Sequence, residues 1–505
     1  MGFSFVYASA LEGLKAIPVR VEADISKGLP KFCIVGLPDA AVSESKERVR
    51  SAMKNSGLEF PRTAITINLA PADVKKQGPV YDLAIALSIL SAQENITSTE
   101  ALRHTVFLGE LALDGSIKPV RGVLLSALMA KAQGYTHVVV AKENAVEAAL
   151  VNQITVLPAE SLMQVVDHLN GKTLLARQSQ TLYSSALKTH LDMAHIRGQE
   201  HVKRALEVAA AGGHNVLMFG PPGSGKTMLA RALPSLLPPL SFEDCLEITA
   251  IHSVAGLTHD SLEQQRPFRA PHHTASGVAL VGGGAWAKPG EISLAHRGIL
   301  FLDEFPEFSR HVLENLRQPL EDGIVTVSRA TGTFEYPARF MLIASMNPCP
   351  CGYLNDQLRQ CICTPIQIQR YQQKISGPLL DRIDIISEVP RVEIDKLMAT
   401  TLSEDSKTIR ERVCAARAIQ AQRFFATSIR SNAELRGDLL QQHCELDTNC
   451  AHLLKNAIEK LNLSARAYTR ILKVSRTIAD LSASTHIQIE HLAEALQYRP
   501  KLQQA

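Results

Sequence analysis

The sequence predicts an α/β fold organised around one glycine-rich loop, with a second α/β domain in front of it and a helical domain behind it. Three observations predict this arrangement. An apolar run at residues 215–219 leads directly into the loop at 220–227, whose sequence is G-P-P-G-S-G-K-T, and a helical pattern follows. Strand-like and helix-like stretches alternate over residues 1–170, whereas residues 396–505 carry only helical patterns. At 505 residues the chain is too long for one hydrophobic core.

The composition narrows the class of protein. A chain with 46% hydrophobic and 20% charged residues is expected to be soluble and globular. Its formal net charge of +3 neither favours nor excludes a nucleic-acid partner, so any polyanion contact requires a local basic patch. No apolar run approaches the roughly 18 residues that span a bilayer, and the N-terminus lacks the charged segment of a signal peptide. We therefore expect a cytoplasmic protein without a membrane partner.

The glycine-rich loop has the residue types of a phosphate-binding loop. Glycines let backbone N–H groups point at phosphates without a side chain in the way. In such a loop Lys226 reaches the β- and γ-phosphates of ATP, and the hydroxyl of Thr227 binds Mg²⁺. The alternative is a turn in an ordinary α/β unit. The predicted nucleotide-binding residues are Gly220, Pro221, Pro222, Gly223, Ser224, Gly225, Lys226 and Thr227.

Two adjacent carboxylates follow a second apolar strand at residues 299–302. A parallel strand beside the phosphate loop would deliver Asp303 to the Mg²⁺ and place Glu304 where it can polarise the attacking water. The alternative is a core strand that runs into a surface turn. A third apolar strand, residues 339–345, ends shortly before Asn347.

The front domain, residues 1–170, resembles the proteolytic domain of Lon. The matching segments are K-Q-G-P-V-Y-D at 76–82, G-E-L at 109–111 and R-G-V-L at 121–124. In Lon the nucleophilic serine and its lysine partner occupy the positions that Val80 and Leu124 hold here. The resemblance therefore implies a Lon-like fold without a Ser–Lys dyad and without peptidase activity. The alternative is that these short matches are accidental. A polar stretch at 171–190 is interpreted as a linker.

Residues 191–395 resemble an AAA+ ATPase core. The segment that starts at Ile196 has the pattern I-x-G-Q-x-x-x-K-R-A-L, which many AAA+ modules carry at their N-terminal end. The resemblance implies that Ile196 packs near adenine. It also implies that Asn347 senses the γ-phosphate. Residues 379–384, L-L-D-R-I-D, resemble the arginine-finger segment of the AAA+ branch that includes MCM and magnesium chelatase. Arg382 would then act on the ATP of a neighbouring subunit; the alternative is a surface arginine paired with Asp381 or Asp384.

The helical residues 396–505 are predicted to form the lid of the ATPase. Its expected helices are residues 409–423, 449–461, 465–481 and 489–498. In the same branch a lid arginine contacts the γ-phosphate from the same subunit, and Arg466 matches it. Arg470 lies four residues on and shares that face of the helix, so it is the alternative.

Four cysteines lie close together in the sequence, as Cys349, Cys351, Cys361 and Cys363. Two Cys-x-Cys pairs on so short a segment suit a tetrahedral Zn²⁺, although the spacing within each pair is tighter than usual. The alternative is a loop with free thiols. We expect a four-cysteine knuckle with a structural zinc, which could brace Asn347 and Arg382 or contact DNA.

An insertion at residues 251–286 resembles the helix-2 insert of the magnesium-chelatase and MCM branch. Arg266, Phe268 and Arg269 could contact phosphates and stack on bases; the alternative is a solvated loop between subunits. His272 and His273 are interpreted as loop residues near a ring pore rather than metal ligands.

With the Lon-like domain and the cysteines, this insertion makes the chain similar over essentially its whole length to the ComM competence family of magnesium-chelatase-like proteins. The resemblance implies an ATPase that uses ATP and Mg²⁺, forms a homo-hexamer and moves along DNA. It would act as a helicase and in branch migration on single-stranded and branched recombination intermediates during natural transformation. One alternative is a chelatase-type ATPase subunit that remodels a protein partner. Another is a nucleotide-switched scaffold that binds DNA without moving. Val80 and Leu124 disfavour a Lon-like protease.

Overall fold

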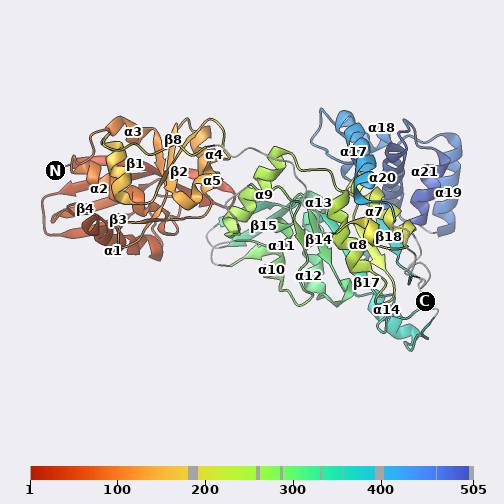
Figure 1. Ribbon diagram of the computed structural model, residues 1–505. Helices are drawn as coiled ribbons and strands as arrows, with labels where there is room; N and C mark the ends of the chain where they lie inside the picture. Colours follow the sequence, from red (N-terminus) through yellow and green to blue (C-terminus); the bar gives the residue numbers. More distant parts are fainter. Residues whose placement is uncertain are drawn as a thin grey trace. The chain divides into compact units, whose positions relative to one another are not determined.

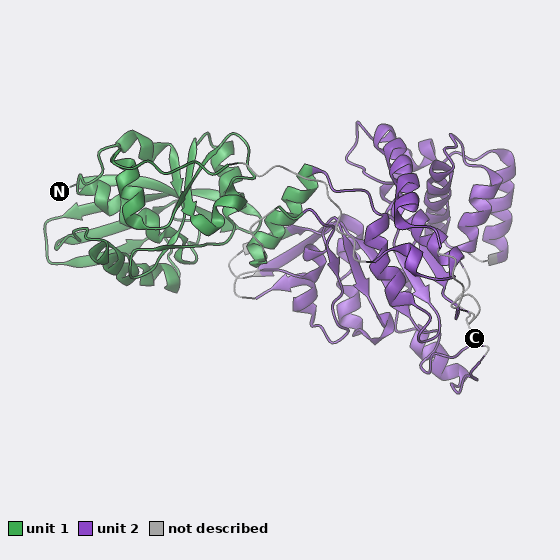
Figure 2. Cartoon of the chain, in the orientation of Figure 1, with its two compact units in different colours: residues 1–184, 242–263, 330–335 green, residues 185–241, 264–329, 336–505 purple. Residues whose placement is uncertain are grey.

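The computed structural model describes residues 2–179, 191–257, 262–284, 288–329, 332–356, 358–392, 403–461 and 463–499. The chain forms two compact units, coloured in Figure 2. Unit 1 comprises residues 1–184, 242–263 and 330–335, and unit 2 comprises residues 185–241, 264–329 and 336–505. Residues 180–190 of the predicted linker and residues 396–402 of the predicted lid lie outside the described residues.

Unit 1 contains a seven-stranded mixed sheet with the order β3-β4-β2-β1-β5-β8-β9 (Figure 1). Long antiparallel strands β1 and β2 pair from Gly2↔Ile25 to Glu12↔Lys15, whereas β5, β8 and β9 run parallel. The strands are β1 Gly2–Glu12, β2 Lys15–Ser26, β3 Lys31–Val35, β4 Ala64–Ala70, β5 Thr105–Phe107, β8 His137–Ala141 and β9 Thr155–Ala159, with a separate pair β6 Glu110–Leu111 and β7 Ile117–Lys118.

The core of unit 1 is centred on α2. Every residue of α2 Asp82–Ala92 is buried, as expected of a helix that is apolar on all sides. Asp82 is tolerated there because the guanidinium of Arg48 and the hydroxyl of Ser45 donate hydrogen bonds to its carboxylate. The remaining helices are α1 Ala40–Asn55, α3 Thr99–Arg103, α4 Val123–Ala132, α5 Ala145–Ala148, α6 Leu162–Leu169 and α9 Phe242–Ala255.

Unit 2 contains a five-stranded parallel sheet with the order β11-β14-β17-β10-β18. Its strands are β11 Phe268–Arg269, β14 Ile299–Leu302, β17 Met341–Met346, β10 Val216–Phe219 and β18 Ile385–Glu388. All of β14, β17 and the first three residues of β10 are buried, which explains why they appear in the sequence as unbroken apolar runs. Because every pairing is parallel, the carboxyl ends of these strands share one edge of the sheet.

Helices surround this sheet and continue into the lid, drawn in blue in Figure 1. Helix α7 Glu200–Gly212 precedes the first strand of the sheet. Between the strands in the chain lie α8 Lys226–Ala232, α10 Gly277–Val281, α11 Glu291–Leu294, α12 Arg310–Glu314, α13 Arg317–Asp322, α14 Pro365–Gln372 and α15 Gly377–Leu380. Short strand pairs are β12 Gly282–Gly283 with β13 Lys288–Pro289, and β15 Ile324–Arg329 with β16 Gly332–Pro337. The lid helices are α17 Ser406–Arg423, α18 Gly437–His443, α19 Thr448–Leu461, α20 Ala465–Leu481 and α21 Ile489–Gln497.

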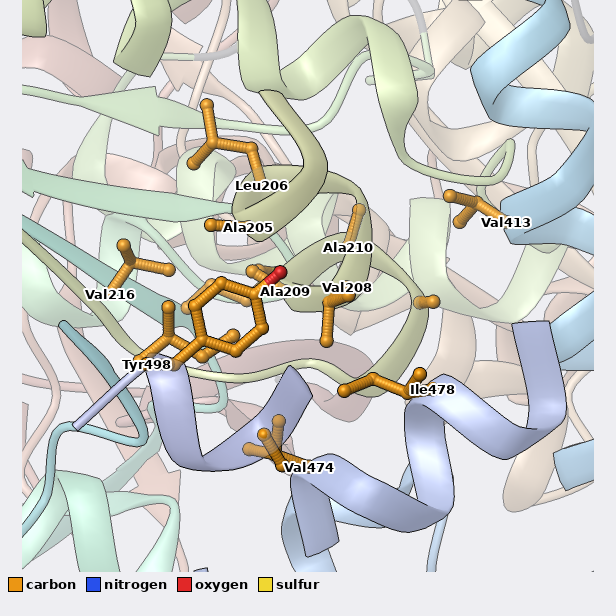
Figure 3. Packing of buried hydrophobic residues seen from close by; sticks show 14 of the residues in the cluster. Ala205, Leu206, Val208, Ala209, Ala210, Val216, Val413, Val474, Ile478 and Tyr498 are labelled. Carbon is orange, nitrogen blue, oxygen red and sulfur yellow. The ribbon is translucent and has the colours of Figure 1, made fainter. Parts of the chain in front are cut away.

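The alanine-rich face of α7 joins the lid to the sheet. Ala209 and Ala210 are fully buried, and Figure 3 shows them in one cluster with Val474 and Ile478 of α20. Small side chains on α7 let the lid helices pack closely against it, so the lid and the sheet share one hydrophobic core.

The structure differs from the sequence-based domain boundaries at two segments. Residues 242–263 and 330–335 belong to unit 1 by their contacts, although the sequence places both in the domain 191–395. On α9 the hydroxyl of Ser253 donates to the carboxylate of Glu147 at 2.5 Å, and the N–H of Gly122 donates to Ser253 Oγ at 3.0 Å. Hydrogen bonds between residues so distant in the chain leave no local pattern in the sequence.

Candidate active site

The phosphate-binding loop lies where the sequence predicts it. Strand β10 ends at Phe219 and helix α8 begins at Lys226, so residues 220–225 form the turn between them. Gly223 and Gly225 have φ values of +77° and +93°, which L side chains rarely adopt. A Cβ at either position would meet no atom within 4 Å, which leaves open space in front of the loop backbone. This open, glycine-lined turn at a helix N-terminus suits an anionic phosphate.

Lys226 spans the loop. Its Nζ donates hydrogen bonds to the carbonyl oxygens of Gly220 and Pro221 at 2.8 and 2.9 Å and to Asn347 Oδ1 at 3.3 Å. Burial lowers the pKa of Lys226 to about 8, and the charge of Asp303 opposes that shift. A bound phosphate would stabilise the charged ammonium. The side chains of Lys226 and Asn347, which the sequence analysis assigned to one site, thus meet in the structure.

The two predicted Mg²⁺ ligands meet at the carboxyl end of the sheet, where Thr227 follows β10 and Asp303 follows β14. Thr227 Oγ1 donates to Asp303 Oδ2 at 2.9 Å, and the hydroxyl of Ser345 donates to Asp303 Oδ1. A hydroxyl and a carboxylate offer the oxygen atoms that Mg²⁺ prefers, so these residues fit the ion. The sequence analysis missed Ser345, although a serine near the end of an apolar strand beside the phosphate loop was a usable signal.

Glu304 lies beside a histidine that the sequence analysis assigned elsewhere. Its backbone has a φ of +52° and its side chain is 57% exposed, with Oε2 at 3.3 Å from His273 Nδ1. The ring of His273 stacks on that of His272 at 4.1 Å between centroids. His273 follows β11, which pairs with β14, so the sheet order brings it to the carboxylate. His273 thus lies beside a candidate active-site carboxylate, and its position near a ring pore stays a prediction.

The side chains of Arg266, Phe268 and Arg269 make contacts within unit 2, and their contact with DNA stays a prediction. Arg269 donates from Nε and Nη2 to the carboxylate of Glu291 at 2.6 and 2.7 Å. Arg266 donates to two backbone carbonyls, and Phe268 stacks on Phe301 with 5.9 Å between ring centroids. The predicted loop contains strand β11, the edge strand of the parallel sheet.

The two predicted catalytic arginines of the finger and lid lie together, at the other end of the sheet. Arg466 Nη1 is 3.0 Å from Asp381 Oδ2, and the neighbouring Arg382 forms an ion pair with Glu321. Arg382 precedes β18 in the chain, and Arg466 lies beside the start of that strand through its contact with Asp381. Ile385, the first residue of β18, pairs with Val216, the first residue of β10. The phosphate loop follows the opposite end of β10. The contact of Arg466 with the γ-phosphate of its own subunit therefore stays a prediction, and its neighbour in this structure is Asp381.

A buried ionic network fixes this second group. Asp384 is buried, which by itself would raise its pKa, but His214 and Arg470 hold the pKa down at about 2. His214 Nδ1 lies 3.3 Å from the Asp384 carboxylate and Arg470 Nε 3.4 Å from it. Arg470 is 8% exposed and also donates to the carbonyl of Ile383 at 3.2 Å. Arg470 is thus a structural residue, whereas Arg466 is 58% exposed and pairs with Asp381.

The arginine group contains several guanidinium groups, each close to a carboxylate: Arg382 pairs with Glu321, Arg466 with Asp381 and Arg470 with Asp384. Burial lowers the pKa of Arg382, and the charges of neighbouring arginines lower it further. Mutual repulsion between guanidinium groups is relieved by negative charge, which these carboxylates supply here.

The lead-in segment reaches the phosphate loop from the other side. Ile196 is buried, and Gln199 Nε2 lies 3.5 Å from the carbonyl oxygen of Ser224 and also donates to that of Pro390. The structure therefore places this segment beside the loop. Contact of Ile196 with adenine stays a prediction.

The four cysteines form one cluster. Their sulfur atoms all lie within 4.8 Å of one another, with Cys349 to Cys351 at 3.4 Å and Cys351 to Cys361 at 3.6 Å. Burial raises the pKa of Cys349 to about 12. Four sulfur ligands at such separations suit a tetrahedral Zn²⁺.

In unit 1 the positions that correspond to the Lon dyad carry no catalytic group. Leu124 is fully buried, and its N–H donates to Glu147 Oε1 at 3.1 Å. Val80 has an apolar side chain. Neither position supplies a nucleophile or a base.

Comparison with known proteins identifies the family. Residues 192–397 match the family model described as magnesium chelatase, subunit ChlI, residues 21–144 match subunit ChlI of Mg-chelatase, and residues 403–499 match the ChlI C-terminal model. The competence protein ComM of Haemophilus influenzae is 45% identical, with 99% of this chain and 98% of that protein covered. The chain belongs to the ComM-type magnesium-chelatase-like family.

Other members and relatives extend this result. YifB of Escherichia coli is 46% identical, with 99% of this chain and 97% of that protein covered. The magnesium-chelatase 38 kDa subunit of Cereibacter sphaeroides is 27% identical over 47% of this chain and 75% of its own length. ComM-type proteins thus combine a Lon-like ChlI domain with an AAA+ module, which indicates an ATPase. Among the described residues, no helix is long and apolar enough to cross a membrane.

Proposed function

We propose that this ComM-type protein is an ATP-driven motor that assembles into a homo-hexameric ring and moves along DNA. It would unwind DNA and promote branch migration of recombination intermediates, extending the integration of incoming single strands during natural transformation. The observation that carries the proposal is the separation of two half-sites, a phosphate loop at one end of a parallel sheet and an arginine group at the other.

This separation favours a head-to-tail assembly. A surface that carries the phosphate loop and a different surface that carries Arg382 and Arg466 can complete each other only between copies. Such heterologous contacts close into a ring when the rotation between copies allows it. Six copies is the number that the family resemblance implies.

Within one site of the ring, each residue has a defined role. Lys226 binds the β- and γ-phosphates, and Asn347 orients the attacking water beside it. Thr227 and Asp303 would hold Mg²⁺, which neutralises phosphate charge when bound. Glu304 accepts the proton of the water. Arg382 and Arg466 of the neighbouring copy stabilise the charge that develops on the transferred phosphoryl group.

Support for DNA as the substrate comes from the relative in Haemophilus influenzae, whose name assigns it to competence. Arg266 and Arg269, which also make contacts within unit 2, are candidate residues for binding DNA phosphates.

The decisive experiment measures ATP hydrolysis by the full-length protein alone and with single-stranded, duplex and forked DNA, together with strand displacement. We expect stimulation by branched or single-stranded DNA and displacement that requires ATP. Lys226→Ala and Glu304→Gln should abolish both, because they remove phosphate binding and water activation. Glu307→Gln is the matched control, since Glu307 lies three residues on and pairs with Lys374 at 3.1 Å.

Two other results would favour different functions. DNA binding without displacement by the wild-type protein would favour a nucleotide-switched scaffold. ATP hydrolysis that no DNA stimulates would favour a chelatase-type subunit that remodels a protein, which the similarity to the 38 kDa magnesium-chelatase subunit makes the second candidate.

We also propose that the cysteine cluster holds one structural Zn²⁺. Metal analysis of protein purified without chelators should find about one zinc per chain. Cys361→Ser should lower that value, whereas Cys33→Ser, which changes a cysteine of unit 1, should leave it unchanged. Wild-type protein free of metal would refute the zinc site.

A further inference from the structure

The loop between the cysteines packs directly on the phosphate loop. Gly352, next to Cys351, has a φ of +84°. A Cβ at this position would lie 2.7 Å from Cδ and 2.8 Å from Cγ of Pro222, and 3.8 Å from Cγ of Asn347. Real Cβ atoms do not approach other atoms this closely, so the backbone at Gly352 touches the proline ring. The cysteine loop is thus one wall of the phosphate loop.

The same loop is held from a second side by the segment that follows β18. Arg391 Nε donates to Asp356 Oδ2 at 2.9 Å, and its guanidinium lies 5.8 Å from the ring centroid of Tyr353. Asp356 is nearly fully buried and also accepts hydrogen bonds from the N–H groups of Leu358 and Arg359. The loop therefore contacts both the phosphate loop and the chain beyond β18, although its tip around Leu358 is exposed to solvent.

The cysteines bracket this bridge. Cys349 and Cys351 come immediately before Gly352, and Cys361 and Cys363 close the segment that contains Tyr353 and Asp356. A metal bound by all four sulfurs would close the loop and hold Gly352 in place against Pro222. Without the metal, the segment loses its cross-link and can adopt many more conformations.

We propose that the four-cysteine cluster controls ATP affinity, because the metal-closed loop presses Gly352 against Pro222 and sets the conformation of the phosphate loop. The proposal rests on the proposed ATP site. It gives the metal a role in nucleotide binding, distinct from contact with DNA and from stabilisation of the chain as a whole.

The experiment compares full-length variants by the affinity for a fluorescent ATP analogue and by zinc content. Gly352→Ala adds the Cβ that would collide with Pro222, and we expect its dissociation constant to rise about tenfold to a hundredfold with zinc retained. Gly57→Ala is the matched control: Gly57 has a φ of +76°, but a Cβ there would meet no atom within 4 Å. It shares the backbone strain without the contact and should bind the analogue normally.

A compensating change tests the contact itself. Pro222→Ala combined with Gly352→Ala removes the ring carbons that the new Cβ would meet, so the double variant should recover most of the lost affinity. Cys361→Ser, which removes a sulfur ligand, should weaken binding about as much as Gly352→Ala and should lower the zinc content.

Three outcomes would overturn the proposal: normal affinity of Gly352→Ala, equal loss in Gly57→Ala, or no recovery in the double variant. If Gly352→Ala loses zinc and the double variant recovers its affinity, the proposal is still supported. The contact between Gly352 and Pro222 then controls both zinc binding and ATP affinity. If wild-type protein and Lys226→Ala bind the analogue equally, the assigned ATP site itself is wrong, which is a separate result.

Discussion

The two ends of the parallel sheet in unit 2 carry the phosphate loop and the arginine group, which we propose form one nucleotide site between neighbouring copies. At the carboxyl ends of the strands, Lys226, Asp303 and Asn347 share hydrogen bonds with the phosphate loop and its following helix. At the amino ends, Arg382 and Arg466 lie on either side of Asp381. The four residues of β10 between them span about 13 Å of extended strand.

The two ends are also built differently. The carboxyl-end site is open in front of Gly223 and Gly225, and its lysine is held by carbonyl oxygens that a phosphate can replace. The amino-end group stands on a buried network around Asp384 that leaves Arg466 exposed. The carboxyl-end site has open space for a ligand, whereas the amino-end group has an exposed guanidinium. One copy of the chain therefore carries two halves that cannot meet each other.

Removal of Arg382 should have the largest effect. Arg382→Ala should lower the rate of ATP hydrolysis about a thousandfold, because an arginine that acts between subunits stabilises transition-state charge. The measurement is steady-state hydrolysis at saturating ATP, with nucleotide binding checked separately and expected to persist.

Mixing inactive variants sharpens this test. A mixture of Lys226→Ala and Arg382→Ala should regain part of the wild-type rate, because a site with an intact loop can meet an intact arginine from the other variant. Arg466→Ala should behave like Arg382→Ala in the same mixture. No recovery with Arg466→Ala, despite recovery with Arg382→Ala, would return Arg466 to the site of its own subunit.

The network under the arginines should matter for stability. Asp384→Asn should lower the free energy of unfolding by about 3 kcal/mol at neutral pH, because it leaves buried cationic groups without their carboxylate. Asp381→Asn, which loses only an exposed pair with Arg466, should cost less than about 1 kcal/mol.

The pH dependence of that effect has a defined sign. The folded-state pKa of Asp384, about 2, lies below its ordinary value of 3.8, so its contribution is present above about pH 4 and is lost as the pH falls toward 2. Denaturant unfolding at neutral and at acidic pH should show that the difference in free energy of unfolding between Asp384→Asn and wild type becomes smaller as the pH falls. A difference that does not change with pH would contradict this assignment.

ATP affinity should respond to alkaline pH through the phosphate-loop lysine. Burial lowers the pKa of Lys226 to about 8, so the free protein loses the phosphate-binding charge as the pH rises through that value. The dissociation constant for ATP should then rise about tenfold for each further pH unit. Lys226→Arg keeps its charge and should show a flat profile, whatever its absolute affinity.

The smallest effect is expected at His273, a positioning residue beside Glu304. His273→Ala should lower kcat about fivefold and leave KM unchanged, because Glu304 loses a neighbour that orients it but no contact with bound ATP changes. His273→Gln should restore most of the rate, since an amide can also donate to the carboxylate. His272→Ala is the control, because the ring nitrogen of His272 faces Thr274 at 2.9 Å. Equal losses in both histidine variants would argue against a specific role.

The sequence by itself determined the features that depend on neighbouring residues. The phosphate loop needs one strand, one glycine-rich turn and one helix in succession, and residues 215–233 contain them all. Asp303 follows an apolar strand directly, and the periodicity of the lid helices reports which residues are buried. Val80 and Leu124 likewise led to the prediction, without any structure, that a Lon-type Ser–Lys dyad is missing.

Only the tertiary structure decided which of these features meet. The pairing of β11 with β14 brings His273 to Glu304, and it places Arg269 where its guanidinium pairs with Glu291. The parallel register of β10 and β18 separates Arg466 from Lys226, and the fold of the cysteine loop puts Gly352 on Pro222. Such contacts join residues far apart in the chain, whose pairing depends on the free energy of the whole packed sheet rather than on local periodicity.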